Sequence, residues 1–263
     1  MKRIILSIVS LLTALALTSC FEAETTIHLK KDGSGTLVKE LRLGKQMLQI
    51  PAEDLKKMFS EAEKDARDTA MIAKMGEGVT FAKFEPNKDG DAKGWRTTYH
   101  FEYINKLRVS FDLDMEMEME LADPDSAKVT ENDVNPFCTF DYNDGVLTIT
   151  PTPQPKDNAE AARINRKEPG EQELGMMKAI LDGMKVAFKV TMEPGIAETN
   201  ATHRDGDTIT LFDYDVCEVL TDPENTKKLG ALDQENPEKN LGLLKNLKGS
   251  KAEMKPQVTV KLK

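Results

Sequence analysis

The sequence predicts an α+β protein: mainly antiparallel β-sheet, with a long helix over about 51–75 packed on it and short helices near the C-terminus. Three observations predict this class. Short segments that alternate between apolar and polar residues are joined by Asp-Gly and Pro-Gly turns, which favours antiparallel neighbours. Apolar residues recur at helical spacing after Pro51, and the segment Leu107–Leu121 alternates without interruption.

The β-sheet prediction begins with two hairpins whose turns contain Asp-Gly. This dipeptide adopts the positive φ angles that a tight turn requires. The hairpins pair 26–30 with 36–43, around a turn at 31–35, and 137–142 with 146–150. Further strands are predicted at 79–84, 95–104, 185–192, 196–202, 208–220 and 256–263.

The long helix is predicted from a proline start, an apolar face and a glycine stop. Pro51 suits a first helical position, and Gly76 and Gly78 end the pattern. The apolar face, at steps of three or four residues, consists of Leu55, Phe59, Ala62, Ala66, Ala70 and Ala73. Shorter helices are predicted over 174–184, 222–232 and 237–247, the last two capped by Asp222 and Asn236.

The segment Leu107–Leu121 places an apolar residue at every odd position, which predicts a strand with one wet and one dry face. One interpretation is that the dry face packs under the helix of 51–73. The other is that its flexible, polarizable methionines line a groove for an acyl chain or another apolar ligand, with the Pro-containing segment 151–173 as a lid. The residues of that ligand face would be Phe111, Leu113, Met115, Met117 and Met119.

The N-terminus has the organisation of an export signal. Lys2 and Arg3 precede the apolar run Ile4–Leu17, which is shorter than the roughly 20 residues that span a bilayer. Leu17-Thr18-Ser19-Cys20 resembles the lipobox of bacterial lipoproteins. That resemblance implies cleavage before Cys20, with diacylglycerol and fatty acids such as palmitate attached there. In enteric-type lipoproteins an aspartate directly after the acylated cysteine commonly retains the protein at the inner membrane. Phe21 at that position therefore favours the outer membrane.

The domain organisation follows from these segments. Residues 1–19 form the signal peptide, and 20–25 an acylated tether. Residues 26–150 form an N-terminal α+β half, 151–173 a polar linker or lid, and 174–263 a C-terminal α+β half that packs with the first as one unit.

Charge and motifs argue against several functions. Removal of the signal, which holds only Lys2 and Arg3 as charged residues, takes the net charge from −9 to −11. An acidic chain is repelled by nucleic acid, so no nucleic-acid partner is expected. No nucleophile or zinc-protease motif occurs, and the histidines lack metal-ligand spacing, so we expect no catalytic residues, no metal and no cofactor. The carboxylates along one strand from Asp112 to Glu120 cannot converge on one calcium ion without loops folding over them.

Two cysteines remain if Cys20 is acylated. An oxidising compartment allows a disulfide between Cys138 and Cys217. It would stabilise the fold by roughly 4 kcal/mol on a loop-entropy model. The alternative is two thiols that act as small apolar side chains.

Two stretches also resemble LppM-type bacterial envelope lipoproteins. The first is Thr26–Leu43, a strand, Asp-Gly-Ser-Gly and a second strand; the other is Val186–Gly195, followed by Glu198-Thr199-Asn200 and Asp205-Gly206. The resemblance implies an α+β envelope domain. It also suggests lipid or glycolipid binding, as in some members, and assigns no functional residue.

The sequence therefore predicts a non-catalytic lipoprotein of the cell envelope. Acyl chains on Cys20 would anchor it to the lipid bilayer. Its folded part would bind an envelope protein or a lipid, or support surface structure. The alternatives are a carrier or sensor of an apolar ligand, and in third place a hydrolase.

The anchor is tested by Cys20→Ser. Each buried methylene of an acyl chain contributes about 0.8 kcal/mol to membrane binding. We therefore expect the variant to lose its fatty acids in intact-mass analysis and to leave the membrane fraction, whereas Cys217→Ser should keep both. An unchanged mass and partition for Cys20→Ser would contradict lipidation.

Overall fold

The structure, a computed structural model, describes residues 21–44, 51–87, 93–110, 136–152, 174–175, 178, 181–231 and 246–263. Its described part is α+β, with mostly strands in two sheets and four short α-helices. The strands are β1 Phe21–Leu29, β2 Gly35–Leu43, β3 Val79–Pro86, β4 Lys93–Phe101, β5 Cys138–Asn143, β6 Val146–Pro151, β7 Lys185–Met192, β8 Ile196–Thr199, β9 Arg204–Asp205, β10 Thr208–Asp215, β11 Ser250–Ala252 and β12 Val258–Leu262. The helices are α2 Ala52–Ala66, α3 Thr69–Lys74, α7 Val216–Thr221 and α8 Pro223–Gly230, with a 3-10 turn, η2, at Ile104–Lys106.

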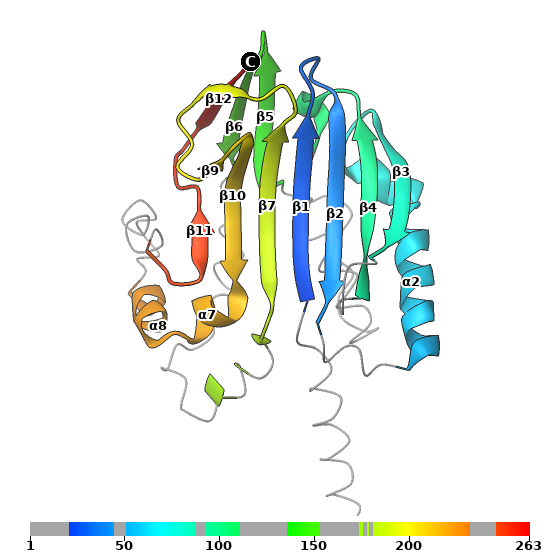
Figure 1. Cartoon of the computed structure of the whole chain (residues 1–263), viewed down its shortest axis with the longest axis vertical. Coiled ribbons are helices and arrows are strands. Elements are labelled where there is room, and N and C mark those ends of the chain that lie inside the picture. The colour runs from blue at the N-terminus through cyan, green and yellow to red at the C-terminus, as the bar shows by residue number, and fades with distance from the viewer. Residues whose placement is uncertain are drawn as a thin grey trace, which may run out of the picture.

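The larger sheet has the order β11-β10-β7-β1-β2-β4-β3, with β9 paired to β10 (Figure 1). Strand β1 pairs with β2 antiparallel, from Phe21 opposite Leu43 to Leu29 opposite Gly35. On its other side β1 runs parallel to β7, from Glu22 beside Lys185 to Leu29 beside Met192. The sequence predicted antiparallel neighbours, and this central parallel pair is the exception. It arises because it joins segments distant in the chain rather than two arms of a hairpin.

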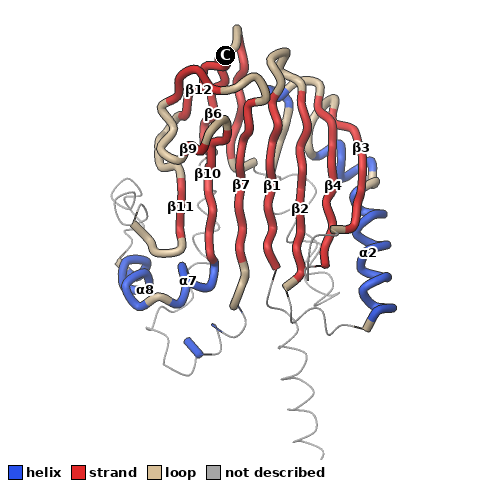
Figure 2. The backbone as a smooth tube through the Cα atoms, in the orientation of Figure 1, coloured by secondary structure: helices blue, strands red, loops and turns tan. Residues whose placement is uncertain are grey.

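The smaller sheet, of order β5-β6-β12-β8, packs against one face of the larger sheet (Figure 2). Because side chains alternate along a strand, Ile27, Leu29, Phe188 and Val190 all point into the space between the sheets and are at most 1% exposed. Leu147, Ile149, Val258 and Val260 of the smaller sheet meet them there.

Both halves of the chain contribute strands to both sheets. Strands β1–β4 lie beside β7, β10 and β11 in the larger sheet, and β5 and β6 lie beside β8 and β12 in the smaller one. The two predicted halves of the chain therefore share one hydrophobic core. The predicted signal, 1–19, lies outside the described residues, as does 153–173 of the linker or lid predicted over 151–173; Pro151 is the last residue of β6.

The two predicted hairpins are present. Lys30 and Ser34 close the first turn by a backbone hydrogen bond of 2.8 Å, Gly33 has φ 86°, and the Asp32 carboxylate accepts the Ser34 N–H at 3.0 Å. In the second turn, Asp144 and Gly145 both have positive φ, as the Asp-Gly dipeptide predicted.

The single long helix was a wrong prediction. The chain forms two short helices because Arg67 ends α2 and the Asp68 carboxylate caps α3, accepting the Ala70 N–H at 2.7 Å. Because of this break, the residues that α3 buries are not the ones that a continuous helix would bury. Leu55, Ala62 and Ala66 are buried as predicted, whereas Ala70 and Ala73 are exposed and Met71, Ile72 and Met75 pack on the core instead.

Three further boundaries differ from the predictions. Residues 21–25 of the expected tether belong to β1, since strands β2 and β7 pair with them on both sides. The predicted strand 208–220 ends at Asp215, whose carboxylate caps α7 by accepting the Glu218 N–H at 2.9 Å. Residues 107–110, the described start of the alternating segment, are not in a strand. Asp222 caps α8 as predicted, and Asn236 lies outside the described residues.

Phe188 tests the packing between the sheets. It is 1% exposed, and its ring lies 6.2 Å from that of Phe137 and 5.8 Å from that of Phe212. Phe188→Ala should lower the free energy of unfolding by about 3–5 kcal/mol in chemical denaturation. Tyr103→Ala, at a 60% exposed position, should change it by about 0.5 kcal/mol or less. Equal effects would contradict the assignment of Phe188 to the core.

Candidate functional site

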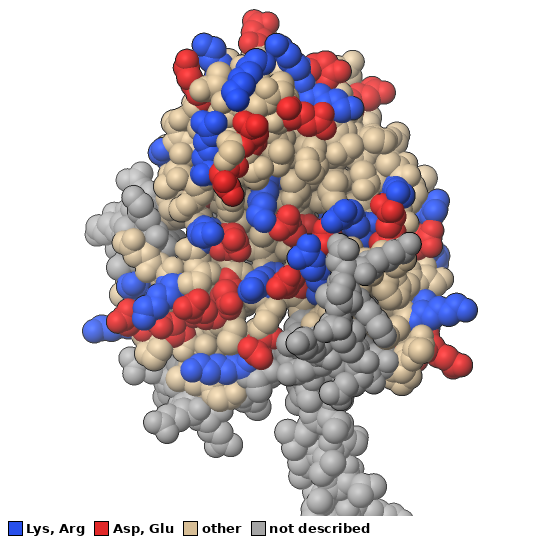
Figure 3. All heavy atoms as spheres, in the orientation of Figure 1, with Lys and Arg blue, Asp and Glu red and all other residues tan. Residues whose placement is uncertain are grey.

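The candidate site lies on the face of the larger sheet that points away from the core. We call it the polar face. It consists of the even-numbered side chains of β1, β2 and β4, and of the side chains of β7 and β10 that point to the same side of the sheet. Two adjoining hollows of about 460 and 660 Å³ lie on it. Glu24, Glu40 and Lys189 line both hollows. None of the described helices covers this face in Figure 1, and Figure 3 shows charged side chains of both signs across it.

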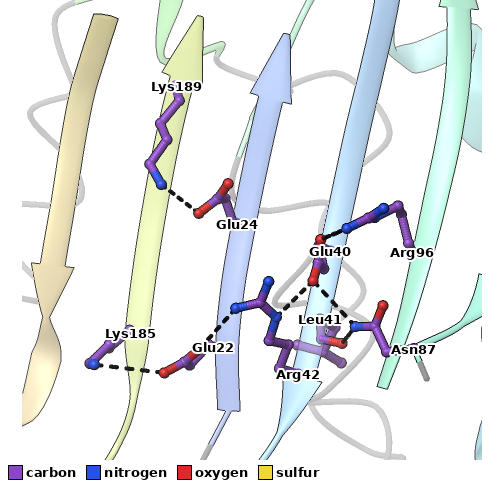
Figure 4. A network of polar contacts seen from close by, with 9 residues as sticks. All are labelled: Glu22, Glu24, Glu40, Leu41, Arg42, Asn87, Arg96, Lys185 and Lys189. Atoms are coloured by element: carbon purple, nitrogen blue, oxygen red, sulfur yellow. Dashed lines mark hydrogen bonds and ion pairs between the residues drawn. The ribbon is translucent and has the colours of Figure 1, made fainter. Parts of the chain in front are cut away.

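Glu40 on β2 is the centre of an ion-pair network (Figure 4). Its Oε1 accepts from Arg42 Nε at 2.7 Å, and its Oε2 accepts from Arg96 Nη2 at 2.6 Å. The side chain is only 11% exposed. Burial acts to raise the pKa of the Glu40 carboxyl, but the hydrogen bonds from Arg96 and Arg42 outweigh it, so the pKa lies below its usual range.

The network continues across β1 to β7. Lys189 Nζ lies 2.6 Å from Glu24 Oε2, which places an ion pair between adjacent parallel strands. Glu22 lies between two cations, 3.6 Å from Lys185 Nζ and 3.6 Å from Arg42 Nη1. The three carboxylates and four cations therefore link four neighbouring strands (Figure 4).

Beyond the network, the second hollow is lined by hydroxyl groups and one imidazole. Thr191 and Thr208 share a hydrogen bond of 2.8 Å between their hydroxyls. The other hydroxyl side chains there are Thr26, Thr98 and Thr210, and His28 adds an imidazole. The polar face thus presents donors and acceptors on hydrogen-bonded strands, which suits recognition of a polar surface.

The polar face does not assemble a metal centre. Across the residues that the structure describes, no group of three His, Cys, Asp or Glu side chains could hold an ion. Glu40 is also unsuited to proton transfer at neutral pH, because two guanidinium groups hold it in its ionised form.

Most of the residues singled out from the sequence lie elsewhere. Cys20 and the predicted ligand face, namely Phe111, Leu113, Met115, Met117 and Met119, are outside the described residues. Leu107 and Val109, at the start of the same alternation, are each 3% exposed and belong to the core. This matches packing against the protein interior for that first part of the segment.

Cys138 and Cys217 are both free thiols in the structure. Cys138 is buried in β5, and burial raises the pKa of its thiol to about 12. Cys217 is half-buried in α7, with its Sγ 3.9 Å from Thr221 Oγ1.

Sequence reasoning missed the polar face, although a signal for it exists. Glu22 and Glu24 alternate with Ala23 and Thr25 in the same way as Glu40 and Arg42 alternate with Leu41 and Leu43. The sequence alone predicts a tether there, because Ala23 is the one apolar residue from Glu22 to Thr26.

The described part is a two-sheet α+β protein with one apolar and one charged sheet face. Among solved structures, it is similar to the folded domain of Mycobacterium tuberculosis LppM, determined by NMR, at 8% identity and a TM-score of 0.30. That match covers 73% of this chain and 81% of the other, and the likeness is weak. No protein-family model matches the chain, and no curated protein matches it. None of the helices in the described ranges is long and apolar enough to cross a bilayer.

Glu40 gives a pH-dependent prediction. Its folded-state pKa lies below the ordinary 4.5, so its ionised form stabilises the fold above pH 4.5, and this stabilisation is lost as the pH falls through the folded-state pKa. Glu40→Gln should cost about 1–2 kcal/mol of unfolding free energy at pH 7, because the amide has a single acceptor oxygen and no charge for the donors Arg42 and Arg96. The difference from the parent should shrink below pH 4.5.

The matched control is Glu198→Gln. Its carboxylate is 77% exposed and lies 3.6 Å from Lys261, so we expect a change of under about 1 kcal/mol. Denaturation curves at several pH values give both results. A Glu40→Gln difference that stays constant from pH 7 to pH 3 would contradict the role of the ionised carboxylate.

Proposed function

We propose that this chain is a membrane-anchored lipoprotein of the bacterial envelope. Acyl chains on Cys20 would hold it to the bilayer, at the outer rather than the inner membrane, and its role would be non-catalytic binding of an envelope protein. The lipobox resemblance at Leu17–Cys20 supports the anchor. The polar face supports the binding role, and it is the observation that carries the proposal.

The size of the polar face suits a protein partner. The five strands that carry the polar face, about 4.8 Å apart, span about 19 Å, and the nine residues of β1 rise about 30 Å. The projected area is therefore about 600 Å², which matches the lower end of the area that each partner buries in a specific interface. The paired charges fix the positions of donors and acceptors, which favours specificity over affinity.

The same features argue against the two alternatives. A carrier needs an apolar pocket. Both hollows of the polar face are lined mainly by charged and hydroxyl side chains. A hydrolase needs a carboxyl group that exchanges a proton near neutral pH, whereas the most buried carboxylate of the network has a lowered pKa.

The binding role is tested by photo-crosslinking in intact cells. A photoreactive residue at Thr98 or Thr210, both on the polar face, should give a discrete crosslinked product. The same residue at Lys56, exposed on α2, should give none. A lipid-sized adduct would instead favour the carrier, and equal products from all three positions would contradict a specific surface.

A charge reversal supplies the matched control. Arg96→Glu removes a partner of Glu40 on the polar face, while Arg67→Glu removes the partner of Glu63 on α2. We expect the Thr98 product to disappear with Arg96→Glu and to persist with Arg67→Glu. Loss with both variants, or with neither, would count against the polar face as the binding surface.

A further inference from the structure

The fold begins one residue after the proposed acylation site. Phe21 is the first residue of β1, and it is paired with Leu43 of β2. The next residue, Glu22, is paired on both sides, with Arg42 and with Lys185. The sheet therefore leaves no free chain between Cys20 and a hydrogen-bonded strand.

This connection sets the height of the sheet above an anchored Cys20. Consecutive Cα atoms lie about 3.8 Å apart. The polar headgroup layer of one leaflet is about 5–8 Å thick. Phe21 must then lie within that layer, and an aromatic side chain is well accommodated there. Leu43, Arg42 and Lys185 lie at about the same level, since they are the register partners of the first two residues of β1.

We infer that the bilayer covers this end of the larger sheet, so that the sheet stands end-on at the membrane. We call this end the anchored rim: Phe21, Glu22, Arg42, Leu43 and Lys185. The inference rests on the proposed acylation of Cys20. Figure 1 shows that β2 and β10 end, and β1 and β7 begin, at the same lower end of the sheet, where α7 follows β10.

The charges of the anchored rim are compatible with headgroups. Arg42 and Lys185 lie on either side of Glu22, and the nearby carboxylate of Asp215 is engaged as the cap of α7. This set is balanced, whereas the whole chain without its signal carries −11. A balanced rim therefore meets anionic headgroups without net electrostatic repulsion.

The orientation determines how a partner reaches the polar face. That face would begin at the headgroups and extend about 30 Å from them, the rise of the nine residues of β1. Tyr103, which follows β4 beside the turn of Gly33, would lie at the far end. A partner would therefore dock from the side, parallel to the membrane plane.

The test is fluorescence quenching in phosphatidylethanolamine–phosphatidylglycerol vesicles that contain a lipid with a nitroxide headgroup. Full-length acylated protein carrying Cys217→Ser is labelled at Lys185→Cys, 50% exposed, or at Tyr103→Cys, 60% exposed. Cys138 should not react, because it is buried and its thiol pKa is about 12. We expect the label at 185 to lose most of its emission and the label at 103 to keep it. Equal quenching, or none at either position, would overturn the inference.

A variant with a spacer tests whether the short connection to Cys20 is what holds position 185 near the headgroups. About twelve Gly-Ser residues between Cys20 and Phe21 would add a reach of about 20 Å. We expect the quenching at position 185 to fall while the intact mass still shows fatty acids. Persistent quenching would overturn the inference that the short connection holds the rim at the bilayer. Absence of fatty acids from the parent protein would instead refute the proposed anchor, so the two failures are distinguishable.

Discussion

The parallel pairing of β1 with β7 is the constraint on which the rest of the structure depends. It joins a strand from the start of the chain to one more than 150 residues later, with Glu24 beside Ala187 and Ile27 beside Val190 in register. One face of that pair supplies Ile27, Leu29, Phe188 and Val190 to the core. The other face brings Lys189 within 2.6 Å of Glu24, so core and polar face are two consequences of one register.

Because side chains alternate with a period of two, a one-residue slip in this pairing would exchange the faces. If β7 slipped against β1, Phe188 would be exposed and Lys189 would be buried away from Glu24, and burying a charge without a good partner is costly. The ion pairs of the polar face are mostly half-exposed, so they contribute little net stability. They act instead by disfavouring other registers, and in the proposed function they also supply the charge pattern that a partner would recognise.

The anchor and the polar face are linked through the same strand. Strand β1 starts at Phe21, directly after Cys20, and carries Glu22 and Glu24 into the network. A lipid on Cys20 would therefore orient the binding surface as well as localise it. In the proposed arrangement, the protein presents a fixed vertical face to whatever moves beside it along the membrane.

Several local structural features could be predicted from the sequence. The two Asp-Gly turns, the alternation of β2, β6 and β7, and the cap at Asp222 were all predicted, because each depends on residues within a few positions of one another. The break at Asp68 was missed because a single capping carboxylate competed with an apolar period that continues through it.

The tertiary structure alone decided that β1 and β7 are neighbours, that residues 21–25 are strand rather than tether, and that Glu40 meets Arg96. Periodicity and turn chemistry predict the fold of most single segments. They do not specify which distant segment lies beside it, because that choice is made by the summed packing of both sheets.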